Sequence, residues 1–130
     1  MLTRRRLLKS VAATSALAFT LPHAARAAGR TLKIGYVSPQ TGPLAIFAEP
    51  DEFVLSQMRD LLKDGLTING ETYPVEIIVK DSQSSSNRAS SVAQELILQD
   101  EVDILCATST PDTTNPVADR AMTESGVWVV

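Results

Sequence analysis

Residues 75–107 read VEIIVKDSQSSSNRASSVAQELILQDEVDILCA, in which two apolar segments flank a polar segment and an amphipathic one. Val75–Val79 is rich in β-branched residues and predicts a strand. The polar, serine-rich residues Lys80–Asn87 lead into a helical face with apolar side chains at i, i+3, i+4, i+7 and i+8. This face consists of Ala89, Val92, Ala93, Leu96 and Ile97. Val102–Ala107 is almost continuously apolar, as in a strand buried on both faces. A strand, a helix and a strand in this order predict a right-handed crossover between parallel strands.

The same alternation extends toward the N-terminus. Leu32–Val37 predicts a strand, and Ser38–Pro43 predicts a loop because it contains proline and glycine. A helix should follow, with Asp51 and Glu52 at the positive end of its dipole and Gly65 at its C-terminal cap. Its expected buried face is Val54, Met58, Leu61 and Leu62. Asn69-Gly70 lies between two apolar arms and predicts a two-residue hairpin whose second arm runs on through Val75 to Val79.

Toward the C-terminus the pattern continues for one more helix and strand. The polar residues Thr108–Thr114 predict a loop, and Asn115-Pro116 predicts the N-cap and first residue of a third helix. The expected buried face of this helix is Val117, Ala121 and Met122, and its expected end is Gly126. Val127–Val130 predicts a strand with no helix after it to cover the sheet. We therefore expect an α/β fold with a doubly wound, mostly parallel sheet that is incomplete in this chain.

The first 27 residues predict an export signal. Arg4–Arg6 precede the apolar run Val11–Leu21 and the small-x-small site Ala25-Arg26-Ala27. The apolar run has about 11 residues and is shorter than the ~20 that cross a bilayer, so a membrane anchor is the weaker interpretation. The arginine pair before Leu-Leu-Lys favours the twin-arginine route, with an ordinary secretory signal as the alternative. We expect cleavage near Ala27 and a mature domain over residues 28–130, outside the cytoplasm.

Removing that segment changes the chemistry that is available. It takes away five of the 12 basic residues and none of the 15 acidic ones, so the net charge falls from −3 to −8. An acidic domain without a basic cluster is a poor partner for nucleic acid. The only histidine, His23, is lost, which excludes a Ser-His-Asp triad, a Cys-His pair and a histidine metal site in the remainder. Cys106 lies in an apolar strand and is expected to be a small buried side chain. We therefore expect no catalysis, no metal and no cofactor.

The candidate site follows from the predicted sheet. Ligands of an open parallel sheet bind at the carboxyl ends of the strands, where the strand order reverses. With the first strand central, the loops 38–43 and 108–114 should meet there. The second loop carries five hydroxyls before a helix N-terminus, where hydroxyls, free N–H groups and the dipole favour a carboxylate or a small oxyanion. These hydroxyls belong to Thr108, Ser109, Thr110, Thr113 and Thr114. Serine and threonine are also common in loops for local reasons, so a purely structural role stays open.

Two further segments lie near these loops in the sequence and have to be assigned to the candidate site or excluded from it. The serine-rich run Ser82–Ser86 follows the second strand of the sheet and is expected to lie away from the reversal point. Phe47, just past the first loop, is either a core residue or an apolar wall for a ligand.

The mature chain resembles the N-terminal lobe of periplasmic solute-binding proteins of the branched-chain amino acid (leucine/isoleucine/valine) class, which feed ABC importers. The resemblance extends from about Leu32 to Gly126. It is carried by Ile34-Gly35, Thr41–Ala45, Ile68–Gly70, Val75–Gln83, Val102–Leu105 with the Ser/Thr loop after it, and Asn115–Val117. It implies a flavodoxin-like lobe in the periplasm, one of two α/β lobes that close over a ligand, with residues 28–130 forming part of the N-terminal lobe.

The resemblance also implies roles for particular residues. The hydroxyls and N–H groups of Ser109, Thr110, Thr113 and Thr114 would hold a ligand α-carboxylate. Thr41 would shape the floor of the cleft, and Phe47 would stand against the ligand side chain. The implied partners are an amino acid, or a related small carboxylate or amide, and an ABC permease in the membrane. The full-length form is expected to be a monomer that captures its ligand without catalysis. Because relatives carry a second lobe, we expect this chain alone to bind weakly or not at all.

Two other classes of protein remain open at this point. A truncated exported α/β enzyme would need catalytic residues further along its reading frame, because the sequence shows no nucleophile with a base and no glycine-rich nucleotide motif. A sensor ectodomain that reuses the binding lobe would instead be followed by a transmembrane segment.

Overall fold

The computed structural model describes residues 29–108, 110–124 and 127–130. The predicted export signal lies outside these residues, as do Ser109 and Gly126. The elements are β1 (Leu32–Ser38), the 3-10 helix η1 (Ala45–Ala48), α1 (Asp51–Leu62), β2 (Leu66–Ile68), β3 (Glu71–Tyr73), β4 (Val75–Asp81), α2 (Ser86–Leu98), β5 (Ile104–Ala107), α3 (Pro111–Thr123) and β6 (Trp128–Val129). Among the described residues, no helix is long and apolar enough to cross a membrane.

The main sheet has the strand order β4-β1-β5-β6, and each neighbouring pair is parallel. The longest pairing joins β1 and β4, from Leu32 opposite Val75 to Ser38 opposite Asp81. The chain passes from β1 to one side of the sheet and then returns to β5 on the other side. The predicted α/β fold with a mostly parallel sheet is therefore confirmed, with β1 central as expected.

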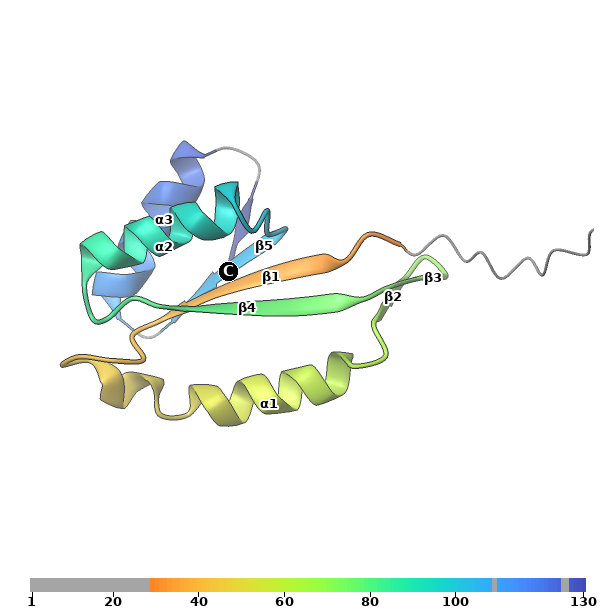
Figure 1. Cartoon of the computed structure of the whole chain (residues 1–130), viewed down its shortest axis with the longest axis horizontal. Coiled ribbons are helices and arrows are strands. Elements are labelled where there is room, and N and C mark those ends of the chain that lie inside the picture. Colours follow the sequence, from red (N-terminus) through yellow and green to blue (C-terminus); the bar gives the residue numbers. More distant parts are fainter. Residues whose placement is uncertain (1–28, 109, 125–126) are drawn as a thin grey trace, which may run out of the picture.

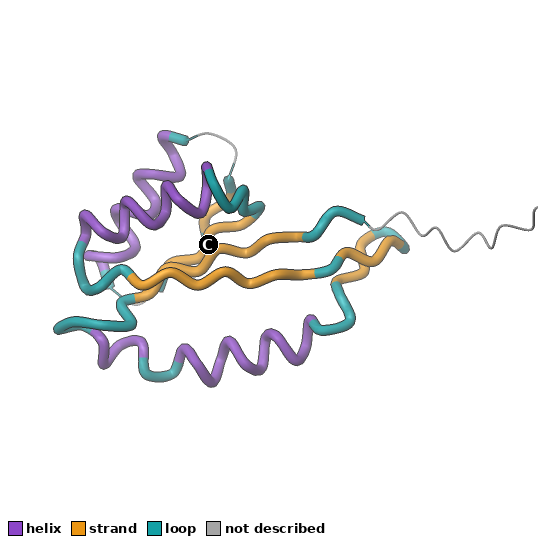
Figure 2. Tube along the Cα trace, in the orientation of Figure 1, coloured by secondary structure: helices purple, strands orange, loops and turns teal. Residues whose placement is uncertain are grey.

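The helices cover both faces of the sheet, but they do so unequally. Figures 1 and 2 show α2 and α3 together on one face and α1 alone on the other. Gly35 of β1 faces α2, because a Cβ there would lie 3.1 Å from a methyl group of Leu96. Side chains alternate along a strand, so Tyr36 points to the other face and donates a hydrogen bond to Asp51 of α1.

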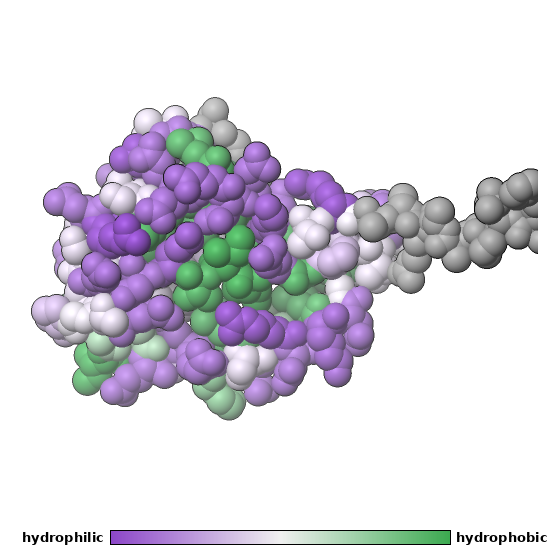
Figure 3. Space-filling view, viewed as in Figure 1, coloured by the Kyte–Doolittle hydropathy of each residue, from purple (hydrophilic) through white to green (hydrophobic). Residues whose placement is uncertain are grey.

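The buried core lies on the face that α2 and α3 cover. All five residues predicted for the buried face of α2 belong to it, so that prediction is confirmed. The core cluster is Val37, Ala89, Val92, Ala93, Leu96, Ile97, Val102, Leu105, Val117 and Ala121. On the α1 face, by contrast, the apolar residues of β1 and β4 are only partly buried: Leu32, Ile34, Val75, Ile77 and Val79. Figure 3 shows apolar side chains gathered over the middle of the sheet, between the helices of its two faces.

The predicted buried face of α1 is wrong. Val54, Met58 and Leu61 are 51%, 39% and 76% exposed, whereas Asp51 and Leu55 are buried. These two residues are one helical turn apart and share a face. The hydrogen bonds that β1 donates to the carboxylate of Asp51 turn that face toward the sheet.

The third helix begins five residues earlier than predicted. Thr110 is its N-cap and Pro111 its first residue, whereas Asn115-Pro116 lies inside the helix. Thr110 is an acceptable N-cap and Pro111 suits the first helical position, so this pair can start a helix and comes first along the chain. Val117 and Ala121 are buried as predicted, but Met122 is 84% exposed, so its predicted burial is wrong.

The hairpin prediction is confirmed in its turn but not in the extent of its second arm. Asn69 and Gly70 have φ of 52° and 84°, as a tight two-residue turn between β2 and β3 requires. The arm does not run on as one strand, because Pro74 separates β3 from β4. Proline has no N–H for a ladder bond, and its carbonyl instead accepts the amide of Leu32 at 2.8 Å.

Candidate functional site

The candidate site lies at the edge where β1, β4 and β5 end. Their last residues are Ser38, Asp81 and Ala107, and the loops after them lead to η1, α2 and α3 (Figure 1). The chain leaves β1 toward β4 on one side, and β5 lies on the other side, so the strand order reverses between β1 and β5. In an open parallel sheet this reversal point is where ligands bind.

Three hydroxyls meet at the start of α3. The Oγ1 of Thr113 lies 3.3 Å from the Oγ1 of Thr110 and 3.4 Å from the Oγ of Ser82. Thr113 is only 1% exposed, and Ser82 is fully buried. This cluster therefore packs the first turn of α3 onto the loop that follows β4.

Thr114 lies at the same end of α3 and is more accessible. It is half-buried, and its hydroxyl donates to the Thr110 carbonyl at 3.1 Å. A neutral hydrogen bond of this local kind is weak, so a ligand carboxylate can replace it. The positive end of the helix dipole favours such an anion, although the carboxylate of Asp112 in the same turn competes with it. Ser109, the remaining predicted hydroxyl, lies outside the described residues.

Thr41 lies in the loop after β1, and its polar groups are bound to Asp81. The Thr41 hydroxyl donates to Asp81 Oδ2 at 2.6 Å, and the Thr41 amide donates to Oδ1 at 3.2 Å. Burial raises the pKa of the Asp81 carboxyl, but hydrogen bonds from the Thr41 hydroxyl and from the backbone of Gln83, Thr41 and Gln40 outweigh this effect. The pKa therefore lies below its ordinary value of 3.8, and Asp81 is ionised at neutral pH.

A buried carboxylate connects β1 to the start of α1. Asp51 accepts hydrogen bonds from the Tyr36 hydroxyl at 3.0 Å and from the hydroxyl of Ser38. Tyr36 is also hydrogen-bonded to the side chain of Thr108, the first residue after β5. Burial raises the pKa of the Tyr36 phenol above 10.0, the hydrogen bond with Thr108 lowers it, and the hydrogen bond and charge of Asp51 raise it further. Through Tyr36, this network connects the start of α1 to β1 and to the first residue after β5.

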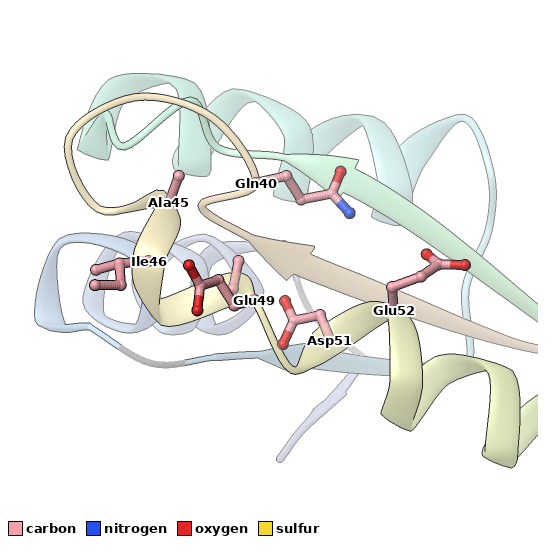
Figure 4. Close-up of a pocket in the computed structure, with 7 residues that line it drawn as sticks. Gln40, Ala45, Ile46, Glu49, Asp51 and Glu52 are labelled. Atoms are coloured by element: carbon pink, nitrogen blue, oxygen red, sulfur yellow. The ribbon is translucent and has the colours of Figure 1, made fainter.

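A cavity of about 400 Å³ opens beside this network, between η1 and the start of α1 (Figure 4). Its lining combines small apolar side chains with three carboxylates. The lining residues are Gln40, Ala45, Ile46, Ala48, Glu49, Asp51 and Glu52. Phe47 belongs to η1 and is 51% exposed, so it is not a core residue.

Cys106 lies in β5 and is half-buried. Burial raises the pKa of its thiol, which disfavours the reactive thiolate. In the described part of the chain, no three His, Cys, Asp or Glu side chains are grouped as they would be around a metal ion.

The structure brings together some of the predicted site residues and adds others. Thr110, Thr113 and Thr114 share the first turn of α3, whereas Thr41 and Phe47 lie on the loop and short helix after β1. Asp81, Ser84, Asp51 and Tyr36 were not predicted. Ser82–Ser86 follows β4, which lies on the side of β1 away from the reversal point, as expected. Ser82 nevertheless contacts Thr113, and Ser84 contacts the Thr41 loop.

A parallel α/β lobe with hydroxyl-bearing loops at the carboxyl ends of its central strands is typical of a lobe that binds a small molecule. The family model described as periplasmic binding protein matches residues 31–130, and the chain belongs to that family. This is a family of solute-binding proteins that work in the periplasm. A comparison with curated proteins gave no match.

Several solved structures of ABC transporter binding proteins share the fold. One is the branched-chain amino acid transporter substrate-binding protein LivJ from Streptococcus pneumoniae in complex with isoleucine, at 26% identity and a TM-score of 0.66, covering 76% of this chain and 28% of that chain. Another is a solute-binding protein from Rhodopseudomonas palustris in complex with 3,4-dihydroxybenzoic acid, at 25% identity and a TM-score of 0.60, covering 72% and 24%. A third is an ABC-type branched-chain amino acid transporter from the same species, at 25% identity and a TM-score of 0.61, covering 75% and 26%. The chain thus matches about a quarter of the length of these proteins.

Proposed function

We propose that this chain is an exported solute-binding subunit of an ABC importer and that residues 28–130 form part of its N-terminal lobe. Its ligand is an amino acid or a related small carboxylate or amide, which is captured without catalysis and passed to a membrane permease. The observation that carries this proposal is the group of threonine hydroxyls at the dipole end of α3, next to the reversal point of the sheet. Isoleucine and 3,4-dihydroxybenzoate, the ligands of two similar proteins, have a carboxylate in common.

Within this proposal, Thr114 contacts the carboxylate, because it makes only a weak bond that a ligand can replace. Ser109 is assigned to the same carboxylate from the sequence alone. Thr110 and Thr113 support them from within the buried hydroxyl cluster. Phe47 is half-exposed in η1, the short helix after β1, and provides an apolar wall.

The proposal is tested by titrating ¹⁵N-labelled residues 28–130 with isoleucine, with 3,4-dihydroxybenzoate and with isoleucine amide, which lacks the carboxylate. We expect millimolar binding of at least one carboxylate, with shift changes in the first turn of α3 and in η1, because one lobe buries only part of a ligand. Calorimetry should give no micromolar affinity. Carboxylates that cause no shift changes in these segments would refute the proposed site.

A matched pair of variants localises the carboxylate contact. Thr114→Ala removes the hydroxyl at the start of α3, whereas Thr123→Ala removes a hydroxyl that makes the same backbone bond, to Asp119, at the far end of that helix. We expect affinity to fall about tenfold in the first variant, as for the loss of a bond to a charged group, and to stay unchanged in the second. Equal affinities in the two variants would exclude Thr114 as a contact.

The export route is tested separately in cells. Replacing Arg4, Arg5 and Arg6 together with lysine keeps the positive charge but removes the arginine pair. We expect the precursor to stay in the cytoplasm, because the twin-arginine route reads the pair. Continued export of the variant would indicate the ordinary secretory route, and mass spectrometry of the exported protein checks cleavage near Ala27.

A further inference from the structure

The loop after β1 makes an open turn around the hydroxyl of Ser84. In a common β-turn, the carbonyl of the first residue accepts the amide of the fourth directly. Here the first residue is Thr41 and the fourth is Leu44, and the Ser84 hydroxyl takes part in both bonds. The Leu44 amide donates to Ser84 Oγ at 3.0 Å, and Ser84 Oγ donates to the Thr41 carbonyl at 2.6 Å. A side chain from another loop therefore completes the turn.

The turn fits closely around this hydroxyl. Gly42 has φ of +90°, which side-chain-bearing residues rarely adopt. A Cβ at Gly42 would lie 2.7 Å from Ser84 Oγ and 2.9 Å from Ser84 Cβ. The absence of a side chain at Gly42 thus permits both the backbone conformation and the contact with Ser84.

The loop after β4 holds Ser84 in a strained backbone conformation. Gln83 and Ser84 are consecutive non-glycine residues with φ of 52° and 56°. Left-handed backbone is unfavourable for residues with a side chain, and such strain is retained where the surrounding structure enforces it. The amide of Gln83 donates to Asp81 Oδ1 at 2.7 Å, which holds the strained segment at its start.

The Thr41 hydroxyl already donates its one hydrogen to Asp81. A hydroxyl has one hydrogen to donate, and the Thr41 hydroxyl gives it to a carboxylate at 2.6 Å. Bonds to a charged acceptor are about twice as strong as neutral ones, so a ligand carboxylate does not displace it readily.

We infer that Ser84 and Asp81 are positioning residues of the ligand site, and that Thr41 acts through Asp81 without touching the ligand. The two residues join the loops after β1 and β4 into one unit and thereby set the position of the segment that leads to Phe47. This inference rests on the proposed function for its consequence in binding, but the joined loops are a property of the free protein.

The first experiment needs no ligand. Amide hydrogen exchange of Leu44 is measured by NMR in Ser84→Ala and in the control Ser91→Ala, which removes an exposed hydroxyl bonded to the carbonyl of Asn87. We expect exchange at Leu44 to be at least about tenfold faster in Ser84→Ala than in the control, because the acceptor of its amide is lost. Equal exchange rates in the two variants would overturn the role of Ser84.

The second experiment is a double-mutant cycle on affinity for whichever carboxylate the wild-type chain binds. Thr41→Val and Asp81→Asn should each lower the affinity, and the double variant should bind no more weakly than the worse single variant. Thr41→Ser keeps the hydroxyl and should bind like wild type. Additive losses would mean that Thr41 contacts the ligand by itself and would overturn its assigned role. If wild type binds no carboxylate, the proposed function fails, and exchange at Leu44 still decides whether the loops are joined.

Discussion

Replacing Asp51 with alanine should lower the free energy of unfolding by about 3 kcal/mol. Asp51 is 6% exposed, and its carboxylate accepts hydrogen bonds from Tyr36 and Ser38. A hydrogen bond to a charged acceptor contributes about 1.5 kcal/mol or more, and two such bonds are lost. Ser38 is fully buried, so the substitution leaves its hydroxyl without the acceptor that it has in the wild type.

The neighbouring residue Glu52 is the matched control. Both acidic side chains lie in the first turn of α1, so both interact favourably with the helix dipole, but Glu52 is exposed. Glu52→Ala should therefore cost only the dipole contribution, about 0.3–1 kcal/mol. The difference between the two variants isolates the buried hydrogen bonds of Asp51 from its effect on the helix.

The assay is urea unfolding of the mature chain, followed by circular dichroism, with the slope compared between variants to check that the same surface is exposed. A cycle with Ser38→Ala should show a coupling free energy of at least about 1 kcal/mol between Asp51 and Ser38. If Asp51→Ala and Glu52→Ala differ by less than about 1 kcal/mol, the reasoning that this network holds α1 to the sheet is refuted.

Three further predictions concern backbone strain and titration. Gly65→Ala should lower the free energy of unfolding in urea by about 2–4 kcal/mol, because its φ is +86° and a Cβ would lie 2.6 Å from a backbone oxygen. The control Gly70→Ala, at φ of +84° with open space around it, should lower it by only about 1 kcal/mol. Equal losses in the two variants would contradict the clash. The pKa of Asp81 is lowered, so the stability that this residue contributes is present above pH 3.8 and lost as pH falls through the folded-state pKa. The difference in unfolding free energy between wild type and Asp81→Asn should therefore shrink in acid. A difference that persists unchanged at about pH 2 would contradict this prediction. The pKa of Tyr36 is raised, so its contribution to stability is complete below pH 10.0 and lost as pH rises through the folded-state pKa. Ultraviolet titration should show a lower Tyr36 pKa in Asp51→Asn than in wild type. An unchanged Tyr36 pKa would contradict the contact between Tyr36 and Asp51.

The accuracy of the sequence-based fold prediction depended on how many apolar stripes each helix carries. α2 has one such stripe, from Ala89 to Ile97, and all of its predicted residues are buried. α1 has competing possibilities, because Phe53 and Val54 stand beside Leu55. The stripe that faces the sheet is selected by a polar residue, Asp51, and hydrophobic periodicity contains no information about polar contacts. α3 begins before its predicted first residue because two residue pairs, Thr110-Pro111 and Asn115-Pro116, can each start a helix.

The site was predictable where it depended on strand order and not where it depended on contacts between loops. The hydroxyls before α3 follow from the reversal of strand order, which the alternating pattern already implied. Asp81 and Ser84 were missed because their partners, such as Thr41, lie about 40 residues away in sequence. One signal was available: β4 pairs with the central strand along its whole length, so the loops after the two strands had to be neighbours.

The unequal burial of the two sheet faces has a consequence for how the molecule opens. α2 has five buried side chains distributed along its length, whereas only Asp51 and Leu55, in the first half of α1, are buried in that helix. Segments with few buried contacts open at a lower free energy than the whole molecule. We therefore expect the second half of α1 to open at a lower free energy than β1, β5, α2 and α3, which share the buried core.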